Sequence, residues 1–226
     1  MNILAIDTSG HIASVAILSD GEILTEFTTN NKITHGENLA PLVDSAFKFT
    51  KLDYEDLDYI ACSSGPGSFA GLRIGASFCK AVAHSLNIPI IPIPTLDVLA
   101  YNIFDCNSLI VPIIDAKRNQ LYASIYQREN TDLKRISDYL LIEFHELENL
   151  IKKENKKAVF LGDGVKLHKD KILENHSIAS LNNLSQRAGS LVSAAVNNLD
   201  EKVHYKDFAP FYIKLSQAEE DLNKKT

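Results

Sequence analysis

Short apolar runs alternate with longer amphipathic stretches along this chain. The apolar runs predict buried strands, at residues 3–6, 13–18, 23–28, 58–63 and 88–93. Apolar side chains that recur every three or four residues predict helices, near residues 35–50, 68–86 and 95–104. Asp20-Gly21, between two of the strands, is typical of a hairpin turn. The first part of the chain therefore predicts a mixed α/β unit of order β-β-β-α-β-α.

The same order of elements begins again after residue 105. Residues 113–125 can be laid over residues 5–17, and in both segments an aspartate, Asp115 or Asp7, closes an apolar strand. The rest of the pattern predicts an extended stretch, a helix, a strand and a helix, near residues 135–142, 143–153, 158–161 and 185–198. We therefore predict an α/β protein built by duplication. The predicted lobes are residues 1–104 and 105–226, and we expect the end of the chain to fray from about residue 215.

Composition and charge limit the partners of the protein. A content of 45% hydrophobic and 23% charged residues is ordinary for a soluble globular protein. The net charge of -6 and the pI of about 5.6 argue against a chain that grips nucleic acid unaided. Cys62, Cys79 and Cys106 show no metal-binding spacing and predict reduced thiols in a cytoplasmic protein. No apolar run reaches the roughly 20 residues that span a bilayer, so we expect no membrane partner.

The stretch from residue 63 to residue 83 carries the most specific pattern. Gly65-Pro66-Gly67 predicts a tight turn after a strand, and Ser68 predicts the N-cap of a helix. Small residues follow at four-residue steps and fall on one face of that helix, namely Gly71, Gly75, Cys79 and Ala83. Mid-helix glycines are unfavourable, so another backbone must come close. That backbone belongs to the chain itself or to a partner protein; a phosphate site in the first turn is a third interpretation.

The segment Gly-Pro-Gly-Ser-Phe-Ala-Gly-Leu-Arg-Ile-Gly, residues 65–75, resembles the signature of the TsaB (YeaZ) family, with Ala70 where that family usually has Thr. Residues 210–214 also resemble the end of that family, with Lys214 in place of Arg. The resemblance implies a two-lobed fold of the actin, sugar kinase and Hsp70 superfamily. It also implies a non-catalytic subunit that binds the catalytic TsaD subunit, joined by the ATPase TsaE.

The complex implied by this resemblance forms threonylcarbamoyladenosine next to the anticodon of tRNAs that read codons beginning with A. The subunit would meet tRNA indirectly, through the complex, and would form a homodimer without its partner. We expect its docking face on the helices near residues 35–50 and 68–86. The candidate interface residues are Leu39, Leu42, Val43, Ala46, Gly71, Arg73, Ile74, Gly75, Phe78 and Cys79. Arg73 is either an interface anchor or the internal partner of a carboxylate.

A second hypothesis is a stand-alone small-molecule kinase of the same superfamily. In such folds carboxylates at strand ends face a cleft that holds magnesium and ATP, and the candidate nucleotide-binding residues here are Asp7, Ser9, Asp115 and Gly162. Only Gly10 lies near Asp7 to let backbone amides wrap a phosphate, and aspartates at such positions often cap their own turns. We therefore expect no cofactor of its own, with ATP and magnesium as the open alternative.

Other catalytic centres find little support in the sequence. The catalytic TsaD relatives begin the helix at residue 35 with His-x-x-x-His, whereas this chain has His35 and Leu39. Because leucine cannot bind a metal ion, we expect no metal site and no catalytic residue. Gly65-x-Gly67-x-x-Ala70 fits a loose dinucleotide fingerprint, but the next strand lacks the acidic residue that would bind the ribose.

Overall fold

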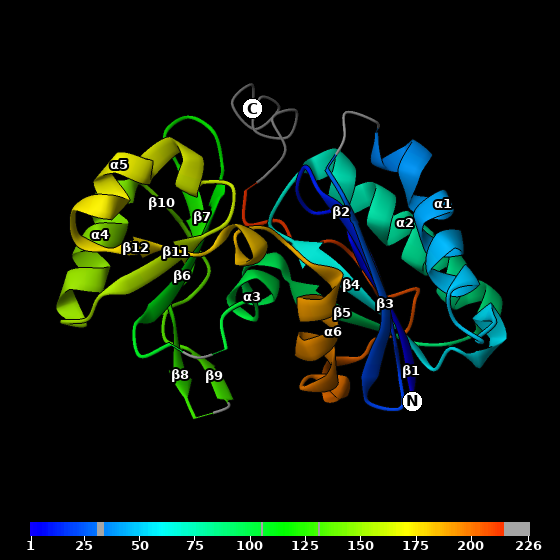
Figure 1. Cartoon of the computed structure of the whole chain (residues 1–226). Coiled ribbons are helices and arrows are strands. Elements are labelled where there is room, and N and C mark those ends of the chain that lie inside the picture. The colour runs from blue at the N-terminus through cyan, green and yellow to red at the C-terminus, as the bar shows by residue number, and fades with distance from the viewer. Residues whose placement is uncertain (31–33, 105, 131, 215–226) are drawn as a thin grey trace, which may run out of the picture.

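The computed structural model describes residues 1–30, 34–104, 106–130 and 132–214. It has two lobes, each built on one β-sheet with helices packed on it (Figure 1). The predicted frayed end from about residue 215 lies outside the described residues. Within the described ranges, no helix is long and apolar enough to cross a membrane.

The first sheet has the strand order β3-β2-β1-β4-β5. Its strands are β1 (Asn2–Asp7), β2 (Ala13–Ser19), β3 (Glu22–Thr29), β4 (Tyr59–Gly65) and β5 (Ile90–Pro94). Alternation along β1 places Leu4 and Ile6 in one buried cluster and Ile3 and Ala5 in another. Two helices, α1 (His35–Lys48) and α2 (Phe69–Leu86), pack on the face of the sheet that carries Leu4 and Ile6. The short helix η1 (Tyr54–Asp56) lies between them in the chain. The opposite face, which carries Ile3 and Ala5, packs against α6 (Ala188–Val196).

The second sheet repeats this arrangement, with the strand order β10-β7-β6-β11-β12. Its strands are β6 (Leu109–Asp115), β7 (Leu121–Ala123), β10 (Leu140–Ile142), β11 (Ala158–Leu161) and β12 (Ser177–Ile178). The hairpin of β8 (Tyr126–Glu129) and β9 (Asp132–Arg135) was not predicted; it pairs with β6 and projects from the lobe (Figure 1). Apart from this insertion, the strands occupy corresponding positions in the two sheets. This symmetry supports the predicted duplication.

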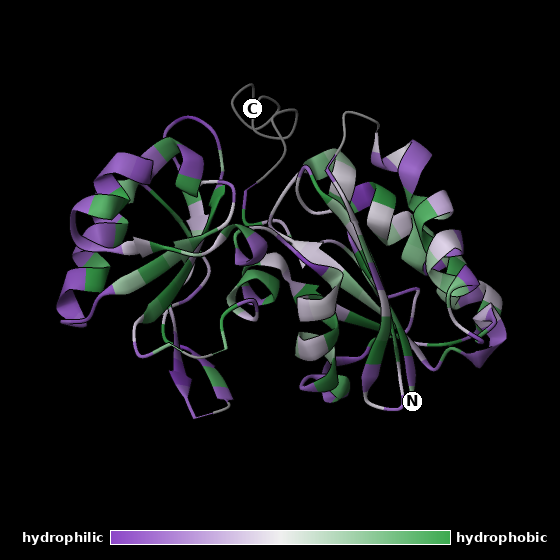
Figure 2. Ribbon diagram, viewed as in Figure 1, coloured by the Kyte–Doolittle hydropathy of each residue, from purple (hydrophilic) through white to green (hydrophobic). Residues whose placement is uncertain are grey.

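The helices of the second lobe are α4 (Phe144–Lys153) and α5 (Val165–Asn175). Phe144, Leu147 and Ile151 form the buried stripe of α4, while its outer face is hydrophilic (Figure 2). The sequence pattern did not predict α5. Its apolar residues do not follow one stripe, because Leu167 and Leu173 are exposed on a helix whose mean hydropathy is low.

The last helix of each lobe in chain order packs against the sheet of the other lobe. The helix α3 (Thr95–Ala100) follows the first sheet, yet Leu96 and Leu99 pack in a cluster with Ile110 and Leu161 of the second sheet. The helix α6 follows the second sheet and packs on the first. The short helices η2 (Leu181–Asn183) and η3 (Leu199–Glu201) flank α6 in the chain. The predicted division between residues 104 and 105 therefore follows the chain order but not the packing.

Candidate functional site

The start of α2 is closed by the turn after β1. The Ser9 carbonyl accepts a hydrogen bond from the Ser68 amide at 2.7 Å, and the Ser68 hydroxyl, as predicted for an N-cap, accepts one from the Gly71 amide at 3.3 Å. The Thr8 hydroxyl donates to the Gly71 carbonyl at 2.8 Å. Two amides at this helix start, those of Ser68 and Gly71, are thus bound by the chain's own backbone and side chains, at a kind of position that in many proteins binds phosphate.

The glycines of α2 make room for the same turn. A Cβ atom at Gly71 would lie 2.1 Å from the Thr8 carbonyl oxygen, and one at Gly75 would lie 2.3 Å from the Thr8 hydroxyl oxygen. Cys79, further along the same face, has no solvent exposure. The small-residue stripe therefore packs against the protein itself. The first of the three interpretations of these glycines fits the structure.

This packing corrects much of the predicted docking face. The buried members of that prediction lie inside the first lobe, namely Leu39, Val43, Ala46, Gly71, Gly75 and Cys79. Of these, Leu39 alone borders a surface groove. They were predicted from helix periodicity, which groups residues on one face but does not say whether that face meets the core or solvent.

The remaining predicted interface residues lie on the outer side of the two helices. Leu42, Ile74 and Phe78 are half-buried, and Arg73 is exposed with its guanidinium 3.8 Å from the centroid of the Phe69 ring. A shallow groove of about 390 Å³ runs between the helices, lined by Gly36, Leu39, Ala40, Arg73, Ile74, Ser77 and Phe78. Arg73 thus faces outward at the rim of an apolar groove, as an interface anchor would.

A second cavity, of about 530 Å³, lies between the lobes. It is lined by the β1–β2 turn, the start of α2, the β6–β7 turn and the chain near its end, including Ser9, Phe69, Asp115, Lys117, Tyr122, Asp163, Tyr212 and Lys214. The Phe211 amide donates to the Ser64 carbonyl at 2.7 Å, and the Lys214 ammonium donates to the Gln120 side chain at 3.3 Å. The end of the described chain therefore connects the two lobes across this cleft.

The predicted nucleotide-binding residues differ in access to the cleft. Asp7 is fully buried, and one of its carboxylate oxygens accepts hydrogen bonds from the Ser9 amide and hydroxyl at 2.9 and 2.7 Å. Burial raises the pKa of the Asp7 carboxyl, against the lowering effect of these hydrogen bonds. Neither side chain is open to a ligand, because the Ser9 side chain is buried as well.

The other two candidates belong to the second lobe. Gly162 is buried with a positive φ of 98°, and a Cβ atom there would lie 2.2 Å from the Ile113 carbonyl oxygen. Asp115 lines the cleft and forms an ion pair with Lys117. Burial acts to raise the pKa of Asp115, but hydrogen bonds and charge from Lys117 outweigh it and leave the pKa below its usual value. Of the four candidates, Asp115 alone presents its side chain at the cleft.

Comparison with known proteins adds the family. A family model described as TsaD: tRNA N6-adenosine threonylcarbamoyltransferase matches residues 22–222. The tRNA threonylcarbamoyladenosine biosynthesis protein TsaB of Bacillus subtilis is 31% identical over 97% of this chain and 96% of its own length. The chain belongs to the TsaB family. TsaB of Buchnera aphidicola subsp. Schizaphis graminum is 35% identical over 73% of this chain and 79% of its own length.

Solved structures agree with this TsaB assignment at the level of the fold. YeaZ from Pseudomonas aeruginosa has a TM-score of 0.78 at 21% identity and covers 94% of this chain and 99% of its own. An activator of 2-hydroxyisocaproyl-CoA dehydratase from Clostridium difficile, solved with bound ADPNP, has a TM-score of 0.50 at 15% identity over 89% of this chain and 95% of its own. The predicted two-lobed actin-like fold is confirmed.

In this TsaB-family chain the helix entry at His35 has a packing role. The His35 Nε2 atom lies 2.8 Å from the Gly10 carbonyl oxygen, and Leu39, one turn later, is 2% exposed in the core. The described residues contain no group of three or more histidine, cysteine, aspartate or glutamate side chains placed to hold a metal ion. Leu39, at the position where the resemblance led us to look for a second histidine, is here part of the hydrophobic core.

Sequence reasoning missed two features of the sites. The sequence did not predict that residues 210–214 contact both lobes. These residues carry a family resemblance, but their pattern does not indicate where they pack. The role of Thr8 was also missed. Its small side chain beside an aspartate looked like an ordinary turn residue, and its contacts with α2 join residues 63 positions apart in the sequence.

Proposed function

We propose that this protein is the non-catalytic partner subunit of a tRNA threonylcarbamoyl transferase complex and binds a TsaD-like catalytic subunit through the α1–α2 groove. The observation that carries the proposal is this groove, in which half-buried Ile74 and Phe78 lie beside exposed Arg73. Apolar side chains with an arginine at the rim are typical of protein interfaces. The family of the chain supplies the identity of the partner.

The closed start of α2 supports the non-catalytic part of this proposal. Kinases of this fold need open amides near the first strand to hold phosphate, whereas here the Ser9 carbonyl accepts from the Ser68 amide and Asp7 accepts from the Ser9 amide. The subunit therefore acts by holding its partner rather than by chemistry of its own. In the full proposal a TsaE-like ATPase joins the complex, tRNA is bound through the complex in the cytoplasm, and the groove forms a homodimer when the partner is absent.

The experiment measures association with the TsaD-like protein of the same organism by biolayer interferometry. Ile74→Glu places a charge in the groove and should weaken binding by more than about tenfold, because burying an unpaired charge is costly. Phe49→Glu is the matched control, since Phe49 is 75% exposed at the far end of α1. Equal affinity of the two variants would overturn the docking face. Turnover of ATP by the lone chain would overturn the non-catalytic role.

Gly75→Leu is not a suitable probe of this interface, although Gly75 is among the predicted interface residues. A side chain at that position meets Thr8 inside the lobe. Loss of binding in that variant would therefore report damage to the fold.

A further inference from the structure

Gly36 lies in the first turn of α1 and lines the α1–α2 groove. A Cβ atom at this position would meet, among the described residues, only the Thr34 hydroxyl oxygen at 3.9 Å, which is an ordinary contact distance. Its φ angle is not in the left-handed region, since the described glycines with positive φ are Gly21, Gly65 and Gly162. Neither the space nor the backbone conformation in the described part of the chain therefore requires glycine here.

This glycine differs from those of α2. A Cβ atom at Gly71 or Gly75 would lie 2.1 or 2.3 Å from an oxygen of Thr8, so the fold itself explains both residues. A glycine in a helix is less favourable than an alanine, because it loses more conformational freedom on folding. Gly36 is exposed in the groove, and no described residue fills the space beside it. This position favours a partner whose backbone comes close to α1.

The groove also limits the chemistry of such a partner. Its described lining is apolar at Leu39, Ile74 and Phe78, and Arg73 is the only charged residue among the lining residues that the structure describes. The interaction found for Arg73 with the described residues is its contact with the Phe69 ring, and none of their carboxylates pairs with it. Covering this guanidinium without a carboxylate would be unfavourable. A partner that fills the groove should therefore be apolar and carry one carboxylate beside Arg73.

Two aromatic rings hold Arg73 in place. Its guanidinium carbon lies 3.8 Å from the centroid of the Phe69 ring, and the Phe69 and Tyr212 centroids are 5.1 Å apart. Both rings are partly exposed, so this stack lies at the surface. A guanidinium that stacks through its flat face keeps the N–H groups at its edge available for a bidentate pair with a carboxylate. The stack therefore orients Arg73 before a partner binds.

We propose that the groove binds an apolar segment of the TsaD-like subunit that carries a carboxylate, and that Gly36 sets how closely this segment approaches. The backbone of the segment contacts α1 at Gly36, its apolar side chains pack on Ile74 and Phe78, and its carboxylate accepts from Arg73. Gly36 and Arg73 line the same groove from its two helices. This inference rests on the proposed function, because it describes the occupant of the same groove.

Gly36→Leu tests the close approach by biolayer interferometry with the TsaD-like protein. The added side chain has room in the free chain, so the midpoint of thermal unfolding should rise by about 1–3 °C through the higher helix propensity. In the complex the side chain displaces the partner's backbone, and binding should weaken by more than about tenfold. A glycine that the fold itself needed would instead lower the unfolding midpoint when replaced.

Ala70→Leu is the matched control. Ala70 is the second residue of α2, as Gly36 is of α1, and it is exposed outside the groove lining. This variant should bind as the wild type does. Wild-type binding by Gly36→Leu, an equal loss in Ala70→Leu, or a fall of the Gly36→Leu unfolding midpoint would each overturn the inference. If Ile74→Glu still loses binding in that case, the docking proposal stands without the close approach; if it does not, both fail.

A second copy of the chain is the alternative occupant. Sedimentation of the lone chain distinguishes it from the TsaD-like subunit. If Gly36→Leu loses self-association but binds the TsaD-like protein as the wild type does, the close contact joins two copies, and the assignment to the catalytic partner is overturned.

Arg73→Met tests the carboxylate of the partner, because methionine keeps an apolar stem and removes the charge. Raising the NaCl concentration from about 50 mM to about 500 mM should weaken wild-type binding at least about threefold more than it weakens binding of Arg73→Met, since salt screens an ion pair. Lys48→Met is the control, as Lys48 is exposed in the last turn of α1 and outside the groove lining. It should keep the salt dependence of the wild type. The same salt dependence in Arg73→Met would overturn the acidic partner segment.

Discussion

Asp7 ends β1 in the first lobe, and Asp115 ends β6 at the corresponding place in the second. Asp7 is fully buried beneath the turn that it caps through Ser9, whereas Asp115 is partly exposed and pairs with Lys117. The turn after Asp115 contains three consecutive residues with left-handed φ angles of 63°, 55° and 64°, at 117, 118 and 119. The two copies of one structural unit therefore differ in whether this turn is packed or exposed.

The difference continues in the glycine turns that face these aspartates. In the first lobe a Cβ atom at Gly67 would lie 2.2 Å from the Ser9 carbonyl oxygen. In the second lobe a Cβ atom at Gly164 would lie 3.1 Å from the Ile113 carbonyl oxygen. The first lobe uses its turn as a packed contact between β1 and α2. In the second lobe the glycine turn is packed as closely at Gly162, where a Cβ atom would lie 2.2 Å from the same Ile113 oxygen, and is less crowded at Gly164.

The pair Gly67→Ala and Gly164→Ala tests this comparison and should give the largest effect. Gly67→Ala should lower the free energy of unfolding by about 3 kcal/mol, because a backbone carbonyl must move to admit the methyl group. Gly164→Ala should change it by less than about 1 kcal/mol, because the strain is small and the unfolded chain loses entropy. Urea denaturation measures both values. Similar losses in the two variants would contradict the comparison.

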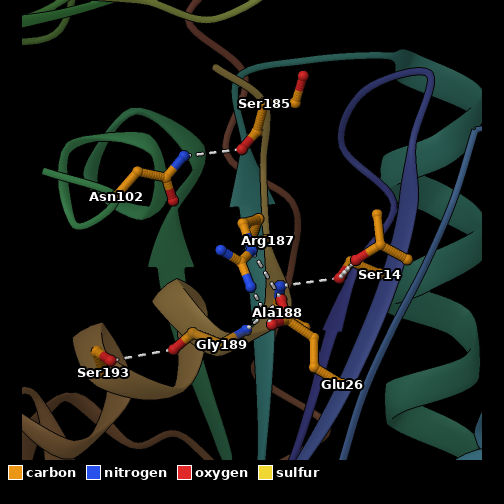
Figure 3. Close-up of polar contacts among 9 residues, drawn as sticks. Ser14, Glu26, Asn102, Ser185, Arg187, Ala188, Gly189 and Ser193 are labelled. Atoms are coloured by element: carbon orange, nitrogen blue, oxygen red, sulfur yellow. Dashed lines mark hydrogen bonds and ion pairs between the residues drawn. The ribbon is translucent and has the colours of Figure 1, made fainter. Parts of the chain in front are cut away.

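The exchanged helices give a second test, of intermediate size. The carboxylate of Glu26 on β3 binds the start of α6, since it accepts from Arg187 and from the Gly189 amide at 3.1 Å (Figure 3). At the corresponding contact of the other lobe, Asp97 on α3 accepts hydrogen bonds from Tyr126 and Tyr139 of the second lobe. Each lobe thus holds the last helix of the other through a carboxylate.

Glu26→Ala should lower the free energy of unfolding by about 2 kcal/mol, because it leaves Arg187 without its partner and removes an acceptor at a helix N-terminus. Glu22→Ala is the control, since Glu22 lies exposed on the same strand. Thermal unfolding at one buffer condition measures both. A loss no larger than that of the control would show that α6 is held by apolar packing alone.

The sequence predicted much of the fold because its periodicity is strong where each element has one buried face. The strand from Ala158 to Leu161 was predicted to the residue, and the helix from residue 35 ended two residues early. Helix α5 was missed because Leu167 and Leu173 face solvent and blur its stripe. Periodicity reports burial, so an element with scattered apolar residues gives little signal.

The candidate site was predicted less well, for a reason that Gly71 illustrates. Its place in the helix correctly indicated that another backbone comes very close. The sequence could not say whose backbone, because Thr8 lies far away in the chain and a partner would impose the same requirement. For Arg73, in contrast, the sequence left open whether the side chain faces inward or outward. Its outward position between helices depends on packing around it, which one sequence does not record.

The smallest expected effect, in the pH dependence of stability, separates the two aspartates by sign. Because burial raises the pKa of folded Asp7 above its ordinary value of 3.8, the folded state holds this proton more tightly than the unfolded state. The contribution of Asp7 to stability is therefore full below pH 3.8 and is lost as the pH rises through the folded pKa. Asp115 behaves oppositely, because its folded pKa is lowered; its contribution is present above pH 3.8 and is lost as the pH falls through the folded pKa.

Asp7→Asn and Asp115→Asn therefore should shift stability in opposite directions at neutral pH. Asp7→Asn keeps an oxygen for the Ser9 hydrogen bonds and removes a carboxyl group whose ionisation burial opposes. It should raise the free energy of unfolding, relative to wild type, by an amount on the order of 1 kcal/mol. Asp115→Asn should lower it slightly, because the ion pair with Lys117 is largely exposed. Denaturant titrations from pH 3 to pH 7 measure both, and a shared sign would show that the two turns do not differ in electrostatics as they do in packing.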